Sequence, residues 1–213
     1  MEERDLSEMR RAYRADTLAR ADLADSWLVQ LERWLEEAVQ SDIAEPNAMV
    51  LATADVDRAP SARTVLLKGL DDRGLTFFTN LRSRKGQELG ANPRATALFP
   101  WIALQRQVIV EGTVEPVDDQ TSDEYFASRP HGSRVAASVS PQSTPVDSRE
   151  ELEALYQRAA TEHPGDVPRP AWWGGLRLKP DTVEFWQGRP DRLHDRLRYR
   201  HTVGEWVVER LAP

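Results

Sequence analysis

The sequence predicts a mainly β fold of the α+β class, an antiparallel barrel with helices packed on its outside. Short apolar runs with strand character recur at intervals of about 8–12 residues, separated by turn signals. Helical segments interrupt these runs without the regular strand–helix alternation that a parallel sheet needs. The glycine-rich GxGxxG and P-loop motifs are absent, which disfavours a Rossmann sheet and a P-loop nucleotide site.

The composition is typical of a soluble, acidic protein. The 213 residues carry 28 Lys and Arg against 35 Asp and Glu, which gives a net charge of −7. Cysteine is absent, which excludes a disulfide scaffold, a thiolate metal site and a cysteine nucleophile. The negative charge argues against a nucleic-acid surface, and the sequence has neither a signal-peptide pattern nor a membrane-spanning run. We therefore expect a cytoplasmic protein with no nucleic-acid or membrane partner.

The first half of the chain predicts one helix followed by several strands. Leu31, Trp34 and Ala38 recur at helical spacing, and Asp25 or Ser26 can cap this helix. The apolar run 48–54 is typical of a buried strand. The further elements expected here are strands at 61–70, 75–79, 95–101 and 105–117, a turn at Asp71-Asp-Arg-Gly74, and a short helix that begins after Ser83 and ends before Asn92-Pro93.

The second half predicts two helices and several short strands. Thr121 with Glu124 and Ser148 with Glu151 match the capping-box pattern, so a helix is expected after Thr121 and after Ser148. Residues 1–24 form a polar arm, which composition alone assigns to a frayed or disordered tail, and residues 25–213 form a single domain. Loops are expected at 138–147 and 163–170, and strands at 176–178, 182–186, 197–199 and 205–211.

Cations lie in segments where a buried strand would carry apolar residues. Arg63 and Lys68 flank a strand-like run, and the period of two puts them on opposite faces, so one faces solvent unless a bulge re-aims it. Thr79 and the run Ser83-Arg84-Lys85 follow at a strand-to-helix junction. Backbone N–H groups at a helix N-terminus attract anions, and a bound phosphate would explain the two cations there.

A second set of polar residues has helical spacing. Tyr125, Arg129 and Ser133 follow one another at intervals of four, which would place them on one face of a continuous helix. Pro130 disfavours helical geometry at Arg129. The set predicts a second phosphate site, and an ordinary amphipathic surface is the alternative for each residue taken singly.

The C-terminal segment carries two cations and an imidazole. In a strand, Arg192, His194 and Arg196 would share one face. His194 beside Asp195 is weak evidence for a general base, because neighbours in a strand point apart. The four histidines lack the spacing of metal ligands, so no metal site is expected, and the GxSxG motif of a serine hydrolase is absent.

A series of short motifs runs in order from residue 10 to residue 213. They are Glu45-Pro-Asn-Ala-Met49, Arg63-Thr-Val-Leu-Leu-Lys68, Thr79-Asn80 with Ser83-Arg-Lys-Gly86, Arg106-Gln-Val108, Tyr125-Phe-Ala-Ser-Arg-Pro130, Ser140-Pro-Gln-Ser143, Glu184-Phe-Trp-Gln-Gly188, Arg192-Leu-His-Asp-Arg196 and Arg210-Leu-Ala-Pro213. This ordered set resembles the pyridoxamine 5′-phosphate oxidase family of flavoproteins. One motif alone is weak evidence, whereas the whole series is highly specific.

The resemblance implies a split β-barrel of antiparallel Greek-key type with peripheral helices. It also implies a homodimer with FMN at the subunit interface. Expected FMN contacts are Arg63, Val65, Leu66, Lys68, Phe78, Thr79, Arg84, Lys85, Gln107, Gln142, Ser143, Trp186 and Arg196. Expected substrate contacts are Arg10, Tyr13, Lys68, Tyr125, Arg129, Ser133, Arg192 and His194, of which Arg192 and His194 are the catalytic candidates. The match also turns the arm into a mobile segment that covers bound substrate.

The activity implied by the resemblance is oxidation of pyridoxamine and pyridoxine 5′-phosphates to pyridoxal 5′-phosphate, a step of vitamin B6 biosynthesis and salvage. A hydride passes from C4′ of the substrate to N5 of the flavin, and O2 reoxidises the flavin to give H2O2. Two alternatives stay open: a related flavin oxidase for another ring system, such as a phenazine precursor, and a non-catalytic flavin- or pyridoxal-phosphate-binding protein.

The sequence departs from the family pattern at five positions. Phe78 stands where the family usually has Tyr, and this change is expected to remove one hydroxyl contact near FMN. The other four departures could reshape barrel packing or the surroundings of the flavin; they are Pro100, Gln105, Ser138 and Leu176. None of the five falls in the expected substrate-phosphate set.

Overall fold

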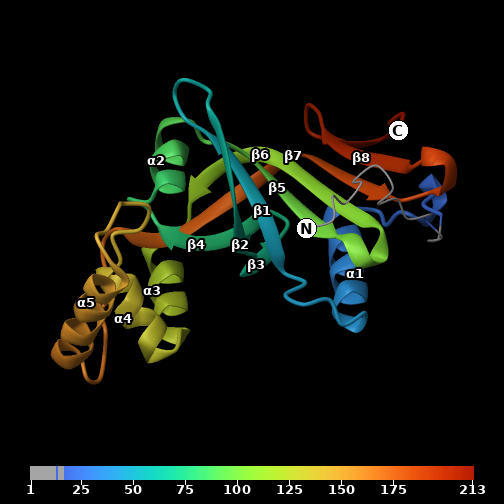
Figure 1. The fold of residues 1–213 in the computed structure, drawn as a ribbon. Helices are drawn as coiled ribbons and strands as arrows, with labels where there is room; N and C mark the ends of the chain where they lie inside the picture. The colour runs from blue at the N-terminus through green and yellow to red at the C-terminus, as the bar shows by residue number, and fades with distance from the viewer. Residues whose placement is uncertain (1–12, 14–16) are drawn as a thin grey trace, which may run out of the picture. The chain divides into compact units, whose positions relative to one another are not determined.

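Nine strands form one sheet in the described part of the chain, residue 13 and residues 17–213 of a computed structural model (Figure 1). They are β1 (Ala48–Ala54), β2 (Pro60–Leu66), β3 (Gly69–Asp71), β4 (Gly74–Asn80), β5 (Arg94–Trp101), β6 (Arg106–Pro116), β7 (Trp173–Gln187), β8 (Asp195–His201) and β9 (Trp206–Arg210). The strand order is β2–β1–β5–β6–β7–β4–β3, and β8 pairs with β7 and β9. The pairs β1–β2, β3–β4, β4–β7, β7–β8 and β8–β9 are antiparallel, which confirms the predicted sheet type.

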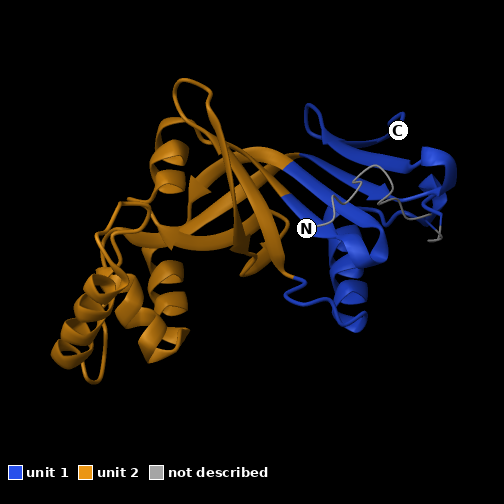
Figure 2. Ribbon diagram, in the orientation of Figure 1, with its two compact units in different colours: residues 1–46, 98–110, 182–213 blue, residues 47–97, 111–181 orange. Residues whose placement is uncertain are grey.

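The chain divides into two compact units (Figure 2). Unit 1 contains residues 1–46, 98–110 and 182–213, and unit 2 contains residues 47–97 and 111–181. Strands β5, β6 and β7 supply residues to both units. The expected division into an arm, residues 1–24, and a single domain, residues 25–213, stays a prediction.

Five α-helices accompany the sheet in the described residues. They are α1 (Trp27–Gln40), α2 (Arg84–Ala91), α3 (Asp119–Ser128), α4 (His131–Val139) and α5 (Arg149–Glu162). The hydroxyls of Ser26, Ser83 and Ser148 accept a backbone N–H at the starts of α1, α2 and α5, so these three of the four predicted caps are confirmed. None of the described helices is long and apolar enough to cross a membrane.

Unit 1 has its core between α1 and the end of β7. Leu31 and Trp34 are fully buried on the apolar face of α1. The ring of Trp34 meets Phe185 of β7 edge-to-face, with the centroids 5.2 Å apart. The guanidinium of Arg106 lies 4.5 Å from the centroid of the Trp34 ring and pairs with Glu37 of the same helix. The predicted helical stripe is therefore the buried face of α1.

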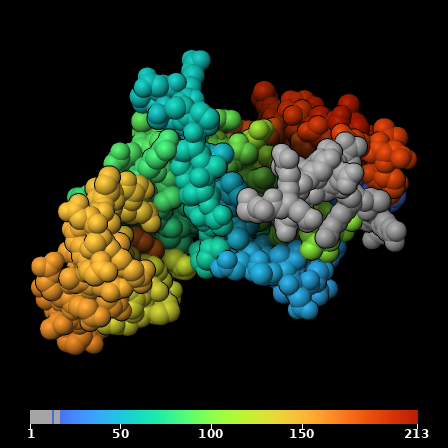
Figure 3. All heavy atoms as spheres, in the orientation of Figure 1, coloured from blue at the N-terminus to red at the C-terminus, as the bar shows by residue number. Residues whose placement is uncertain are grey.

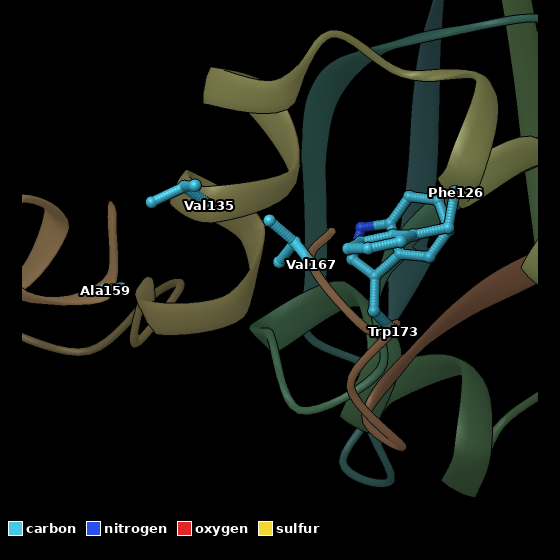
Figure 4. Packing of buried hydrophobic residues seen from close by; sticks show 5 residues of the cluster. All are labelled: Phe126, Val135, Ala159, Val167 and Trp173. Atoms are coloured by element: carbon cyan, nitrogen blue, oxygen red, sulfur yellow. The ribbon is translucent and has the colours of Figure 1, made fainter. Parts of the chain in front are cut away.

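Unit 2 joins three helices to the start of β7. Phe126, Val135, Ala159, Val167 and Trp173 form one buried cluster, drawn from α3, α4, α5, a loop and β7 (Figure 4). Helices α4 and α5 lie side by side in the ribbon and sphere views (Figures 1 and 3). This cluster holds the end of α3 and the start of α4 in place at the start of β7.

The expected elements differ from the structure at four places. The strand 61–70 is interrupted after Leu67: the N–H of Leu67 still donates to Asn47, the next pair in the β1–β2 register, whereas the N–H of Lys68 donates to Thr76 of β4. Thr121 is not a cap: the carboxylate of Asp118 accepts its N–H and starts α3 three residues earlier. Ser138 lies inside α4 and not in a loop, and the strands 176–178 and 182–186 are one strand, β7.

Candidate functional site

A cavity of about 820 Å³ lies within unit 2. Its walls come from β2, β4, α2, α3, α4 and the loop after α4. The volume is in the range of small-molecule and cofactor sites. Most of the predicted FMN and substrate residues line it: Arg63, Val65, Leu66, Lys68, Phe78, Thr79, Arg84, Lys85, Tyr125, Arg129, Ser133, Gln142 and Ser143.

Arg63 and Lys68 both line this cavity, although an uninterrupted strand would place them on opposite faces. Strand β2 ends at Leu66, and the chain leaves the β1–β2 pairing at Lys68 before β3 begins. Residues of both faces of β2 line the cavity, so lining it does not place the two cations on one face. Lys68 follows the end of β2 and is exposed, in keeping with the expectation that one of the two cations faces solvent.

The junction of β4 and α2 is built for close approach of the two elements. Ser83 accepts the N–H of Gly86 and donates to the carbonyl of Asn80, with Oγ to O at 2.6 Å. A Cβ atom at Gly86 would lie 2.2 Å from the carbonyl oxygen of Leu81, so only glycine fits there. The first turn of α2 therefore carries Arg84 and Lys85 against the end of β4, as the sequence predicted.

Lys85 is a buried cation in this junction, 9% exposed. Its Nζ donates to Thr79 Oγ1 at 3.1 Å, to Ser83 Oγ at 3.3 Å and to Gln142 Oε1 at 3.0 Å. Burial lowers the pKa of Lys85, the charge of Arg63 lowers it further, and Glu88 opposes the shift. The ammonium group is thus anchored by neutral oxygens only, and an anion in the cavity would stabilise its charged form.

Arg63 and Arg84 share a carboxylate. Arg63 Nη2 lies 3.2 Å from Glu88 Oε2, and Arg84 Nε donates to Glu88 Oε1 at 2.8 Å. Arg63 Nη1 also donates to the carbonyl of Leu51 at 3.1 Å. The side chain of Glu88 is 5% exposed and does not line the cavity. The two guanidinium groups therefore contact the cavity on one side and a buried anion on the other.

The second cationic group is stacked on aromatic rings. Arg129 lies 4.9 Å from the ring centroid of Trp173 and 5.6 Å from that of Phe126. Its Nη1 is buried and has no hydrogen-bond partner among the described residues, and burial lowers the pKa of Arg129. Arg129 lines the cavity, and a guanidinium group offers an anion there a planar set of N–H donors.

Tyr125, Arg129 and Ser133 line the same cavity without forming one helical face. Helix α3 ends at Ser128, Arg129 has extended backbone geometry, and α4 begins after Pro130. The two helices bring the residues together across the proline. The predicted convergence is therefore found, by a helix–Pro–helix corner and not by a continuous helix.

The other predicted residues belong to unit 1. The rings of Tyr13, Trp186 and His194 meet one another, with centroids 4.6–5.9 Å apart. Arg196 makes two hydrogen bonds to the carboxylate of Glu184, which raise the pKa of Arg196. Gln107 lies on β6 and is half-buried. Arg10 lies outside the described residues.

Arg192 and His194 do not lie in a strand, so the prediction that they share a face with Arg196 is wrong. Strand β8 begins at Asp195, and Arg192 ends a 3₁₀ turn with a positive φ of 62°. His194 Nδ1 accepts the N–H of Arg189 at 3.0 Å. Asp195 pairs with Arg210 at 2.7 Å and with the side chain of Arg189 at 3.5 Å. The described residues show no hydrogen bond between His194 and Asp195, in keeping with the weak case for a His–Asp pair.

Two important residues of the cavity region were not predicted from the sequence. Trp173 lines the cavity and supports Arg129, and the sequence signal was only an aromatic pair before two glycines. Glu88 holds Arg63 and Arg84, and its spacing of four from Arg84 was the available signal. The cavity therefore presents two groups of cations, which suit the binding of phosphate groups. Unit 1 presents a cluster of aromatic and cationic side chains.

Comparisons with known proteins agree with this chemistry. Residues 35–162 match the family model "Pyridoxamine 5′-phosphate oxidase", and residues 173–213 match "Pyridoxine 5′-phosphate oxidase C-terminal dimerisation region". A pyridoxine/pyridoxamine 5′-phosphate oxidase from Cupriavidus taiwanensis is 54% identical over 209 residues, which is 98% of this chain and 99% of the relative. One from Thermobifida fusca is 51% identical over the whole of both chains.

Solved structures show the same fold. PhzG from Burkholderia lata, in complex with tetrahydrophenazine-1-carboxylic acid, has a TM-score of 0.88 and 33% identity, and the match covers 93% of this chain and 99% of PhzG. A pyridoxamine 5′-phosphate oxidase-related, FMN binding protein from Nostoc punctiforme has a TM-score of 0.73 and 17% identity, over 90% of this chain and 100% of that one. These neighbours confirm the predicted split-barrel architecture, and the curated relatives named above align with 98–100% of the chain. The chain belongs to the pyridoxine/pyridoxamine 5′-phosphate oxidase family.

Proposed function

We propose that this protein is an FMN-dependent oxidase that converts pyridoxine 5′-phosphate and pyridoxamine 5′-phosphate to pyridoxal 5′-phosphate, with O2 as the final acceptor. The family makes it an oxidoreductase of vitamin B6 metabolism and implies a flavin cofactor. The observation that carries the proposal is a single cavity lined by two cationic groups, one at Arg63, Arg84 and Lys85 and one at Arg129. Two phosphate esters, the cofactor and the substrate, account for both.

The first cationic group fits the phosphate of FMN. Arg63, Arg84 and Lys85 line the cavity together with the hydroxyl of Thr79. A phosphate monoester carries about −2 charges near neutral pH and would be costly to bury unpaired. Gln142 and Ser143 supply further polar groups in the same wall. When bound, the flavin supplies the hydride acceptor and its reoxidation by O2 yields H2O2.

The second group fits the phosphate of the substrate. Tyr125, Arg129 and Ser133 offer two hydroxyls and a guanidinium, and Lys68 adds an exposed ammonium group. Their role is to hold the substrate by its phosphate so that C4′ is presented for hydride transfer, which is a proximity effect. Arg192 and His194 would orient the pyridine ring and stabilise charge that develops on it, and neither needs to act as a base.

The site is proposed to be complete only in a homodimer. Residues 173–213 match the family's dimerisation region, and Trp186, Arg192, His194 and Arg196 all lie in it. A two-fold dimer presents each of these residues twice, so each dimer would hold two equivalent sites. We place the dimer in the cytoplasm, as expected from the composition.

A phenazine-type activity is the second candidate, because PhzG shares the fold at 33% identity. The presence of Tyr125, Arg129 and Ser133 in the cavity wall argues against it. A substrate without a phosphate has no use for this set of two hydroxyls and a guanidinium. The curated relatives that are 50–54% identical are pyridoxine/pyridoxamine 5′-phosphate oxidases.

The proposal is tested by turnover of matched substrates. Purified protein loaded with FMN is mixed in air with pyridoxine 5′-phosphate, pyridoxamine 5′-phosphate or unphosphorylated pyridoxine, and H2O2 and aldehyde are measured. We expect one H2O2 for each aldehyde with both phosphate esters, and far lower kcat/KM with pyridoxine. A yellow protein that oxidises neither ester would refute the assignment and leave a flavin-binding role.

A further inference from the structure

Glu88 is the most heavily bonded buried carboxylate near the cavity. Its two oxygens accept hydrogen bonds from Thr53 Oγ1 at 2.5 Å, from Ser61 Oγ at 2.7 Å and from Arg84 Nε at 2.8 Å. Arg63 Nη2 completes the set at 3.2 Å. These bonds hold the pKa of Glu88 at about 2 although burial raises it, so the carboxylate is charged at neutral pH.

The local fold explains why these groups meet. Thr53 of β1 pairs with Ser61 of β2, and Arg63 follows Ser61 by two residues, so Ser61 and Arg63 share one face of β2. Arg84 and Glu88 are four residues apart on α2 and therefore lie on one side of that helix. Helix α2 contacts β1, which brings Glu88 to the hydroxyls of the hairpin.

The network fixes the directions of two cations that face the cavity. Arg63 donates to Thr53, Ser61, Glu88 and the carbonyl of Leu51, so its guanidinium is held on several sides. Arg84 is mostly exposed, and the bond to Glu88 anchors its Nε. Holding both guanidinium groups before the ligand arrives reduces the entropy lost on binding.

The charges also balance. Arg63, Arg84 and Lys85 carry three positive charges and Glu88 one negative charge, which leaves +2 beside the cavity. A phosphate monoester brings about −2. Glu88 also opposes the loss of charge that burial and Arg63 impose on Lys85.

We propose that Glu88 is a positioning residue for the cofactor phosphate, which it never touches. It acts through Arg63 and Arg84, so its charge sets the share of FMN affinity that comes from the phosphate. This inference rests on the proposed use of FMN. The competing account is that Glu88 only fastens α2 to the β1–β2 hairpin, in which case its loss would weaken any flavin equally.

Two flavins separate these accounts, because riboflavin has the ring system of FMN without the phosphate. The full-length chain, freed of flavin, is titrated with FMN and with riboflavin, and quenching of flavin fluorescence gives each Kd. Wild-type protein is compared with Glu88→Gln, which keeps the shape and removes the charge. Glu153→Gln is the matched control, because Arg149 and Glu153 form an exposed i,i+4 pair on α5.

We expect the preference for FMN over riboflavin to fall at least about tenfold in Glu88→Gln, with riboflavin affinity within about twofold of wild type. Glu153→Gln should leave both affinities unchanged. Equal weakening of FMN and riboflavin, or an unchanged preference, would overturn the positioning role. A wild-type protein that binds riboflavin as tightly as FMN would contradict the proposed phosphate site itself, which is a distinguishable failure.

A mutant cycle tests whether Glu88 affects FMN affinity through its two arginines. If Glu88 acts through its two arginines, adding Glu88→Gln to Arg63→Gln/Arg84→Gln should change FMN affinity by less than about twofold. A further loss as large as that of the single variant would overturn the proposal. Should Glu88→Gln fail to fold by circular dichroism, Glu88→Asp replaces it, and its shortened carboxylate should still lower the FMN preference; an unchanged preference would again overturn the role.

Discussion

The ring of Phe78 stacks on the ring of Tyr125, with centroids 4.0 Å apart and planes 19° apart. Trp173 lies nearly parallel to both rings, and its centroid is 5.5 Å from that of Phe78. The guanidinium of Arg129 also lies over the ring of Trp173. One aromatic cluster therefore supports two of the proposed substrate-phosphate ligands. The lost hydroxyl contact to FMN that the sequence suggested for Phe78 stays a prediction.

Removing the stack should weaken substrate binding. Phe78→Leu leaves Tyr125 without its stacked partner, and an aromatic pair of this kind contributes about 0.5–1.5 kcal/mol. We expect KM for pyridoxine 5′-phosphate to rise by about 3–10-fold in steady-state assays, while Phe78→Tyr stays near wild type. If KM is unchanged and FMN affinity falls instead, Phe78 serves the cofactor and not Tyr125.

Arg129 should be irreplaceable by lysine. Its planar guanidinium lies over Trp173, whereas an ammonium group offers neither the planar fork of donors for a phosphate nor the stacking. Arg129→Gln should lower kcat/KM for pyridoxine 5′-phosphate at least about 100-fold, and Arg129→Lys should stay at least about tenfold below wild type. Arg149→Gln, at an exposed position on α5, is the control. Recovery of full activity by lysine would contradict the proposed geometry.

A site shared by two chains predicts complementation in mixed dimers. Arg129→Gln alters the cavity of unit 2 and Arg192→Gln alters the dimerisation region, and each variant alone should be nearly inactive. Random mixing gives half heterodimers, each with one intact site of two, so about a quarter of wild-type activity should return.

The matched control for mixed dimers pairs Arg129→Gln with Tyr125→Phe. Both changes lie in the same cavity, so a heterodimer of these variants has no intact site and should regain no activity. Absence of complementation between Arg129→Gln and Arg192→Gln, with dimers formed, would mean that one chain supplies both residues to a site.

The buried charge of Glu88 should make the free energy of unfolding depend on pH in the acid range. Its pKa is about 2 in the folded chain against an ordinary 4.5, so its contribution is fully present above pH 4.5 and is lost as pH falls toward 2. The depression corresponds to about 3 kcal/mol. Urea unfolding at pH 7 should show Glu88→Gln destabilised by up to this amount, and the gap should shrink by more than half near pH 3. A gap that is independent of pH would show that charge is not its source.

Local signals predicted the parts of the fold that local chemistry decides. Ser26, Ser83 and Ser148 each cap the helix that follows, and the turn Asp71-Asp-Arg-Gly74 closes β3 onto β4. Asp118 explains the failure at Thr121, because a competing acceptor three residues upstream takes its N–H. Where two local signals compete, the sequence alone does not rank them.

Long-range contacts decided what the sequence did not predict. The N–H of Lys68 donates to Thr76 of β4 and not to β1, and Arg192 lies in a 3₁₀ turn with a positive φ. Glu88 bonds to Ser61, which lies 27 positions away in the sequence, and Trp173 stacks on Arg129, which lies 44 positions away. No periodicity encodes such pairings. The family resemblance identified the candidate site residues, and the structure shows which neighbouring residues hold them in position.

The central claim is most directly tested by the visible spectrum of the protein without oxygen. The FMN-loaded chain is mixed anaerobically with one equivalent of pyridoxine 5′-phosphate, and the visible absorbance of the oxidised flavin is followed. We predict that the yellow colour bleaches within the turnover time and returns on admission of air, with pyridoxal 5′-phosphate formed. A spectrum that stays oxidised, with substrate bound, would contradict the account.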